Sequence, residues 1–224
     1  MSRLPSLLDP PVLFADGGAA AQVRAQTLEA YQTAIRLGAT GLTGSLRAVD
    51  GRPAVGPPRR RLARGTPPLA LAELLDLAGD DHAVLLDVID AGAVLESIAQ
   101  VRDRPGLEGL LWLAHPDLDT LAGWRDLSAE VRLVHQAQLD RLPTGPEAHA
   151  AALRRAGVDA LSMHESEWSG GTIALVHRFG RLAVAADAQY DRTLDAAIDA
   201  GIDAVRGIHV DRMVDALVRD RRPG

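Results

Sequence analysis

Short apolar segments of strand length alternate with longer segments of helical periodicity along the whole chain. The expected strands cover 12–15, 41–49, 83–88, 110–114, 131–134, 160–163, 182–186 and 203–205. The expected helices cover 27–37, 69–78, 94–104, 117–127, 146–156, 170–180, 190–200 and 210–219. Continuous apolar strands separated by helices indicate a parallel sheet whose two faces are both covered.

Eight such strand–helix units in 224 residues favour a closed sheet over an open one. A (β/α)8 barrel needs about 200–250 residues, so the length agrees. We therefore predict an α/β fold, a single (β/α)8 TIM barrel. No break in composition marks a second domain, and one domain is expected over 1–224. Within it, 50–68 is rich in Pro and Arg and is expected to form an irregular loop.

Composition excludes several kinds of chemistry. The chain has no cysteine and no lysine, so it cannot use a thiolate, a disulfide or a Schiff-base lysine. The formal net charge of −6 disfavours non-specific nucleic-acid binding. Neither a signal peptide within 1–11 nor a membrane span is expected, and the cytoplasm is the expected compartment. Arginine use throughout, with much Ala, Gly, Pro and Asp, is typical of GC-rich actinobacterial genomes.

Polar residues follow most of the expected strands, at the barrel end where active sites lie. This group contains Asp16, Thr43, Ser45, Asp87, His115, His135, Gln136, His164, Asp187, Gln189 and His209. Acidic and imidazole side chains together suggest a metal site or an acid–base site. The alternative is structural, because a polar residue after a strand often caps the next helix. As a set, these residues predict a small-molecule pocket without identifying a reaction.

The first part of the chain resembles the N-terminal signature of the glycerophosphodiester phosphodiesterase family. In that family the first strand ends in His-Arg-Gly, and Glu-Asn-Thr opens the first helix. Here Asp16-Gly17-Gly18 and Ala25-Gln26-Thr27 stand at these positions with the same spacing. The family's second strand carries Glu-x-Asp, which is Thr43-Gly44-Ser45 here.

The resemblance continues downstream, where it again departs at functional positions. Pro57-Pro58 stands where the family has a His-Asp pair. After the third strand Asp87 matches the family's acidic residue, but Ile89 replaces its lysine. Ile208 replaces an Asp of the eighth strand, and the later strands resemble an actinobacterial-type branch.

The resemblance implies phosphodiester cleavage in lipid metabolism, assisted by Mg²⁺ or Ca²⁺, with two histidines as acid and base. The degenerate positions Asp16, Gly17, Ala25, Gln26, Thr43, Ser45, Pro57, Asp87 and Ile89 lack most of those groups, and no residue is assigned as catalytic. Only Asp16 and Asp87 remain as candidate metal ligands. No cofactor is expected unless residual family activity requires Mg²⁺ or Ca²⁺.

Four hypotheses remain open. The first is a pseudoenzyme that binds a small polar or phosphorylated ligand through Asp16, Asp87, His115, His164 and Asp187. The second is an enzyme with a rebuilt site, and the third is residual phosphodiesterase activity that releases glycerol 3-phosphate and an alcohol. A purely scaffolding role is the fourth and predicts an exposed apolar patch. No protein partner is identified.

Overall fold

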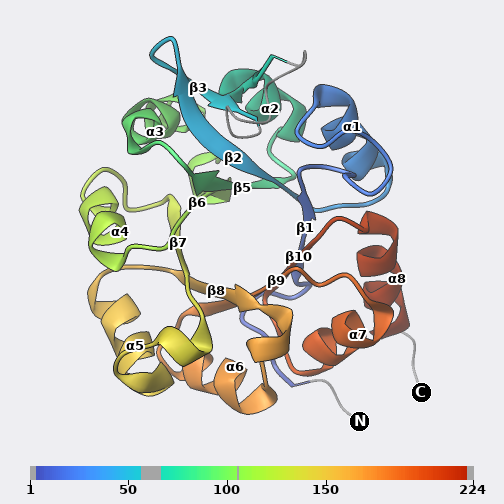
Figure 1. Cartoon of the computed structure of the whole chain (residues 1–224), viewed down its shortest axis with the longest axis vertical. Helices are drawn as coiled ribbons and strands as arrows, with labels where there is room; N and C mark the ends of the chain where they lie inside the picture. Colours follow the sequence, from blue (N-terminus) through green and yellow to red (C-terminus); the bar gives the residue numbers. More distant parts are fainter. Residues whose placement is uncertain (1–3, 57–66, 105, 221–224) are drawn as a thin grey trace.

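The protein forms a closed barrel of eight parallel strands surrounded by helices (Figure 1). The computed structural model describes residues 4–56, 67–104 and 106–220. The barrel strands are β1 (Val12–Asp16), β2 (Gly41–Val49), β5 (Ala83–Val88), β6 (Leu111–His115), β7 (Arg132–Gln136), β8 (Ala160–His164), β9 (Leu182–Ala186) and β10 (Ala204–Gly207). Each pairs with the next, and β1 pairs with both β2 and β10, which closes the ring. The predicted (β/α)8 barrel is confirmed.

A helix follows each strand and packs on the outside of the ring (Figure 1). These are α1 (Leu28–Arg36), α2 (Leu71–Ala78), α3 (Val94–Arg102), α4 (Leu118–Arg125), α5 (Gly145–Arg155), α6 (Gly170–Arg178), α7 (Asp191–Asp199) and α8 (Val210–Asp220). Short 3₁₀ turns lie at η2 (Ala91–Ala93), η3 (Glu108–Leu110), η4 (Leu139–Arg141) and η5 (Glu165–Glu167). Thr27, Asp117 and Ser169 cap α1, α4 and α6 by accepting backbone N–H bonds, which explains where those helices begin. Within the described ranges, no helix is long and apolar enough to cross a membrane.

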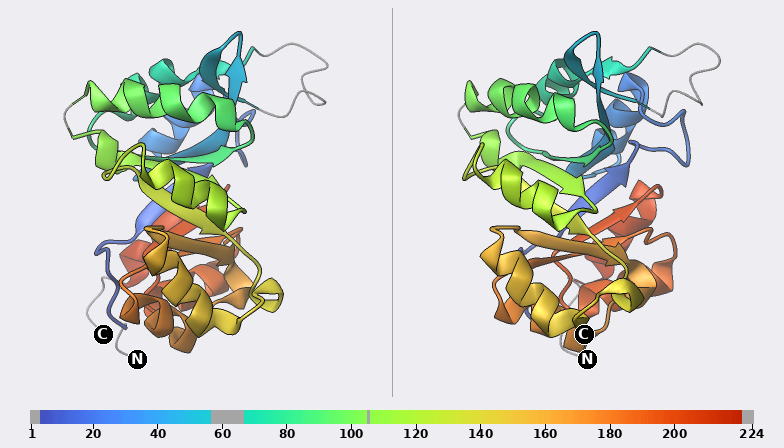
Figure 2. Two further views of the ribbon diagram at one scale, coloured as in Figure 1. Left: turned by 90° about the vertical axis from the view of Figure 1, so that its left-hand side faces the viewer. Right: turned by 60° about the vertical axis from the view of Figure 1, so that its left-hand side comes forward.

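Part of the segment 50–68 is regular, which corrects the prediction of an irregular loop. β2 extends beyond the barrel and pairs antiparallel with β3 (Arg52–Val55), which pairs with β4 (Leu69–Ala70) (Figure 2). The turn uses Asp50 and Gly51, both with positive φ, as two-residue hairpin turns require. The hairpin gives the overhanging end of β2 backbone partners that the barrel cannot supply. Residues 57–66, including Pro57, lie outside the described residues.

The side chains that face the barrel axis form an apolar plug topped by polar groups. Phe14, Leu85 and Trp112 belong to this inner cluster, and Phe14 meets Trp112 edge-on at 5.2 Å between ring centroids. Because side chains alternate along a strand, the residues two positions further toward the carboxyl end face the same axis. In β1, β5, β7 and β10 those residues are polar, namely Asp16, Asp87, Gln136 and Arg206. The pleat therefore brings four polar side chains to the mouth of the barrel.

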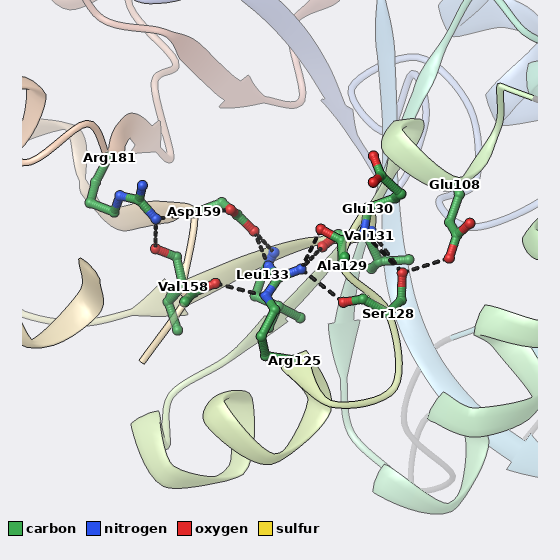
Figure 3. A network of polar contacts seen from close by, with 11 residues as sticks. Glu108, Arg125, Ser128, Ala129, Glu130, Val131, Leu133, Val158, Asp159 and Arg181 are labelled. Carbon is green, nitrogen blue, oxygen red and sulfur yellow. Dashed lines mark hydrogen bonds and ion pairs between the residues drawn. The ribbon is translucent and has the colours of Figure 1, made fainter. Parts of the chain in front are cut away.

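A polar network ties the loops at the amino end of the barrel (Figure 3). The guanidinium of Arg125 donates to the carbonyls of Gly157, Ser128, Ala129 and Val131 at 2.9–3.0 Å. It also pairs with Asp159, whose carboxylate accepts from the Leu133 N–H at 2.8 Å. These bonds join α4 to the starts of β7 and β8, so this end of the barrel is held by structure-stabilising contacts.

Candidate functional site

Arg206 lies at the centre of the barrel mouth, between two carboxylates. Its Nη1 and Nη2 atoms donate to the two oxygens of Asp87 at 2.8 and 2.6 Å. Nη2 also donates to Oδ1 of Asp16 at 2.9 Å. The three side chains come from β10, β5 and β1. The Arg206 side chain is 14% exposed, so it makes these bonds largely shielded from water.

Neutral donors complete the coordination of the two carboxylates. The side-chain amide of Gln136 donates to Oδ1 of Asp87 at 2.6 Å. The hydroxyl of Thr43, which is fully buried, donates to Oδ1 of Asp16 at 3.1 Å. Below it the Tyr31 hydroxyl donates to the Thr43 carbonyl at 3.1 Å. Asp16 and Asp87 are thus held by one cation and by uncharged groups.

The electrostatics follow from that arrangement. Burial alone would lower the pKa of Arg206, but the hydrogen bonds and charges of Asp87 and Asp16 outweigh it and raise that pKa. Burial, then the charge of Asp16, raises the pKa of Tyr31, so its phenol stays neutral. Two carboxylates around one guanidinium carry a net charge of −1. The centre therefore favours hydroxyl donors over anions.

The groups at the mouth do not fit a divalent metal ion. Mg²⁺ and Ca²⁺ take several oxygen ligands, mostly from carboxylates. Both oxygens of Asp87 and one of Asp16 already accept from Arg206. Thr43 and Ser45, beside them on β2, offer only neutral hydroxyls. In the part of the chain that the structure describes, no group of three or more His, Cys, Asp or Glu residues is arranged to hold a metal.

Gly17, Ala25 and Gln26, in the loop that follows β1, support the backbone of that loop. Gly17 has φ of +65°, and a Cβ there would lie 3.1 Å from the Cβ of Ala25. The carbonyl of Gly17 accepts from the Gln26 N–H at 2.8 Å. The Gln26 side chain in turn accepts from the backbone N–H of Ser45 at 3.1 Å. Ala25 and Gln26 therefore hold the loop against β2.

Two further candidate residues, His164 and Asp187, lie at the rim of the mouth. His164, at the end of β8, lies with its Nε2 atom 3.5 Å from Oδ2 of Asp187, and both side chains are exposed at the rim. Asp187 has φ of +60°, a conformation that Asp tolerates better than most residues. Ile89 is 62% exposed and takes no part in the centre. The structure thus brings His164 and Asp187 together.

His115 does not belong to the mouth. It is one residue out of phase with the inward-facing Trp112 and Ala114, so it points toward the helices. Its ring meets Trp124 of α4 at 5.4 Å between centroids. Its Nδ1 accepts from the Asp117 N–H at 3.0 Å. This placement gives no support to the predicted ligand role of His115. The ring instead contacts the residues at the start of α4 and Trp124 within that helix.

A cavity of about 680 Å³ lies beside the mouth, between the loops that follow β6 and β7. His135 and His149 line it, with Nε2 of His149 3.2 Å from Nδ1 of His135. The other ring nitrogen of His135 lies 3.0 Å from the Pro116 carbonyl. Burial, then the neighbouring His149, lowers the pKa of His135 to about 4. Both rings are therefore neutral near pH 7, since burial also lowers the pKa of His149.

Arg206 belongs to the candidate site, but the sequence analysis does not single it out. It is the one charged residue inside the apolar run that forms β10. A charge within a strand buried on both faces needs a partner, so this position carries a usable signal. Its partners, however, lie 119 and 190 residues away in the chain, which no local pattern reveals.

Comparison with solved structures identifies the fold. A phosphodiesterase from Oleispira antarctica, in complex with the product sn-glycerol-3-phosphate, superposes with a TM-score of 0.79 at 14% identity, over 93% of this chain and 97% of that one. A glycerophosphodiester phosphodiesterase from Thermotoga maritima superposes with a TM-score of 0.73 at 16% identity, over 92% of this chain and 97% of that one. Another, from Parabacteroides distasonis, superposes with a TM-score of 0.75 at 13% identity, over 94% of this chain and 98% of that one. No protein-family profile and no curated protein matches the sequence. The resemblance to the glycerophosphodiester phosphodiesterase family is thus confirmed, for the fold of essentially the whole chain.

Proposed function

We propose that this chain is a glycerophosphodiester phosphodiesterase-like barrel that has lost phosphodiester hydrolysis and binds a small polar or phosphorylated ligand at its mouth. The observation that carries the proposal is the engagement of both Asp16 and Asp87 by Arg206. Carboxylates held in this way are unavailable as metal ligands, and an ion-paired carboxylate is a poor general base.

The remaining groups support the same conclusion. General acid–base catalysis contributes about 10²–10⁴-fold and needs a group whose pKa lies near the working pH. Among the described residues, Asp16 stands at the position that the resemblance assigns to a histidine, Gly17 at that of the arginine and Ile89 at that of the lysine. None of the three supplies an imidazole, a guanidinium or an ammonium group. Hydrolysis would therefore lack both proton transfer and charge neutralisation.

The ligand chemistry follows from the charge of the centre. Asp16, Asp87 and Gln136 present acceptors and an amide, which suit the hydroxyls of a glycerol-like or other polyol group. A phosphate group would meet net negative charge at the centre, so it would lie away from Asp16 and Asp87. The Oleispira antarctica structure binds sn-glycerol-3-phosphate, a molecule with both kinds of group.

The test is release of glycerol 3-phosphate from mixed glycerophosphodiesters in Ca²⁺, Mg²⁺ and Mn²⁺, with Asp87→Ala as the matched control. We expect the wild-type chain and the variant to give the same background. Calorimetric titration with sn-glycerol-3-phosphate and with glycerol measures the binding that is expected to remain. Metal-dependent turnover that Asp87→Ala abolishes would refute the proposal.

The alternative is a metal-dependent glycerophosphodiester hydrolase with a reduced or rebuilt site. The approach of His164 to Asp187 at 3.5 Å favours it, because an imidazole beside a carboxylate can accept and return a proton. In the same assay, turnover that is lost in His164→Gln and kept in His115→Gln would support this alternative. His115 is a suitable control because its ring points away from the mouth.

A further inference from the structure

The guanidinium of Arg206 stands where two carboxylates from different strands converge. It binds Asp87 through two parallel bonds and Asp16 through a third. A pair of converging carboxylates at a barrel mouth is ordinarily a place for a divalent cation. We infer that Arg206 is a built-in cation that takes the place of a divalent metal between Asp16 and Asp87. The inference rests on the proposed function and deepens it, because both depend on the same three hydrogen bonds; the two fail separately, since hydrolysis is measured by turnover and the cation site by Mn²⁺ binding.

The geometry of the bonds makes the guanidinium hard to displace. Paired N–H bonds to one carboxylate are among the strongest that a side chain forms. Arginine also stays charged under all ordinary conditions, so it does not deprotonate to admit a metal ion. Asp87 is further held by Gln136 at 2.6 Å, and Asp16 by Thr43 at 3.1 Å. A metal ion would have to break several of these bonds at once.

Displacement would also leave Arg206 without a counter-charge. The Arg206 side chain is largely buried, and β10, from which it extends, is held by strand pairing with β1 on one side and β9 on the other. Leaving a buried charge unpaired is strongly destabilising. Removing the guanidinium has the opposite effect on the carboxylates. It leaves Asp16 and Asp87 facing the same space with only neutral neighbours.

If the inference is correct, a single substitution should create a metal-binding site. Removing the guanidinium creates a vacant two-carboxylate site, so Arg206→Met should acquire affinity for a divalent cation. The matched control is Arg132→Met. Arg132 also lies on the inner face of a barrel strand, but at the other end, with its guanidinium 4.8 Å above the ring of Trp112.

The experiment is titration of the full chain with Mn²⁺, read by the loss of the free-ion electron paramagnetic resonance signal. We expect the wild type and Arg132→Met to show no saturable site up to millimolar Mn²⁺. Arg206→Met should bind one ion, about tenfold or more tighter than the wild type, and the added change Asp87→Asn should remove that site.

Two results would overturn the inference. One is a stoichiometric Mn²⁺ site in the wild type that Asp87→Asn removes. The other is a folded Arg206→Met variant that binds no Mn²⁺, because the guanidinium would then not be standing in a cation site. If Arg206→Met does not fold, the comparison of wild type with Asp87→Asn still decides. Equal and unsaturable binding by the two supports the inference, and a difference between them contradicts it.

Discussion

The Nη2 atom of Arg206 lies 2.6 Å from Oδ2 of Asp87, although the two residues are 119 positions apart in the chain. The contact exists because β10 and β5 belong to one closed ring, and because both residues fall on the inward phase of their strands. It sets the charge of the mouth and couples β5, the third strand of the barrel, to β10, the last. Removing this contact should therefore change both the free energy of unfolding and the affinity for a divalent cation.

The first prediction concerns the stability of this pair. Arg206→Met should lower the free energy of unfolding by about 3 kcal/mol, because it leaves two carboxylates converging without their cation. Urea denaturation followed by circular dichroism measures it. The double variant Arg206→Met/Asp87→Asn should lose less than the sum of the two single variants. Strict additivity would show that the two side chains do not stabilise each other.

The second prediction concerns pH and the two histidines of the side cavity. In the unfolded chain His135 takes up a proton near pH 6.5, but in the folded chain its pKa is lowered to about 4. The unfolded state therefore binds more protons between these values, so stability falls as the pH drops from about 6.5 toward 4. The groups that face His135 are His149, Asp117 and His115.

Between pH 6.5 and 4.5 the His135→Gln variant should lose about 2 kcal/mol less of its free energy of unfolding than the wild type does. Urea denaturation at a series of pH values measures the slope. His82→Gln is the matched control, because His82 lies in the turn before β5 and its ring contacts the Ala78 carbonyl, away from His135. An unchanged slope in His135→Gln would mean that its ring titrates in the folded chain as it does in the unfolded chain.

The third prediction concerns the network at the amino end of the barrel (Figure 3). Arg125→Met removes the side-chain donor of four backbone carbonyls and the ion pair between Arg125 and Asp159, so it should cost about 2–4 kcal/mol of stability. Arg178→Met is the control, because Arg178 forms an ion pair with Glu147 on the surface, where such pairs contribute about 0–1 kcal/mol. Thermal unfolding of both variants makes the comparison. Equal losses would contradict the role assigned to Arg125.

The fourth prediction concerns Asp203, which is fully buried and anchors the N-terminal segment. Its carboxylate accepts from the N–H groups of Leu7 and Ala183 at 2.6 and 2.7 Å. Burial alone would raise the pKa of Asp203, but the hydrogen bond from His177 and the backbone bonds outweigh it and lower that pKa. The stability that the carboxylate contributes is therefore present above its unfolded value, about pH 3.9, and is lost as the pH falls below it.

Asp203→Asn should release the segment that contains Leu7 and Leu8, because an amide cannot accept from all of these donors. Hydrogen exchange at pH 7 should show at least about tenfold faster exchange of those two amides. Asp195→Asn, on the exposed surface of α7, is the control and should leave them unchanged. Unchanged protection in Asp203→Asn would contradict the anchoring role.

The positions of individual residues show how far the sequence predicts the site. Asp16 and Asp87 are predicted at strand ends, and the structure brings both to the mouth. His115 and His164 are predicted by the same rule, yet only His164 lies at the rim. The difference is that His115 is one position out of phase with the inward-facing residues of its strand. The position of a strand end does not specify this phase, whereas the alternation of side chains along the strand does. Asp50-Gly51 likewise carries a hairpin signal within a segment expected to be irregular.

The sequence by itself determined the number and order of the strand–helix units, and hence the barrel, because apolar periodicity and helix caps are local properties. It also predicted, through its resemblance to the phosphodiesterase family, that several of that family's functional groups are replaced. Only the tertiary structure decided that Arg206 pairs with Asp16 and Asp87, since that contact requires the ring to close and three distant strands to share one face. The net charge of the mouth comes from Arg206, Asp16 and Asp87, which are neighbours in space but far apart in the chain. Its chemistry is therefore a property of the folded barrel.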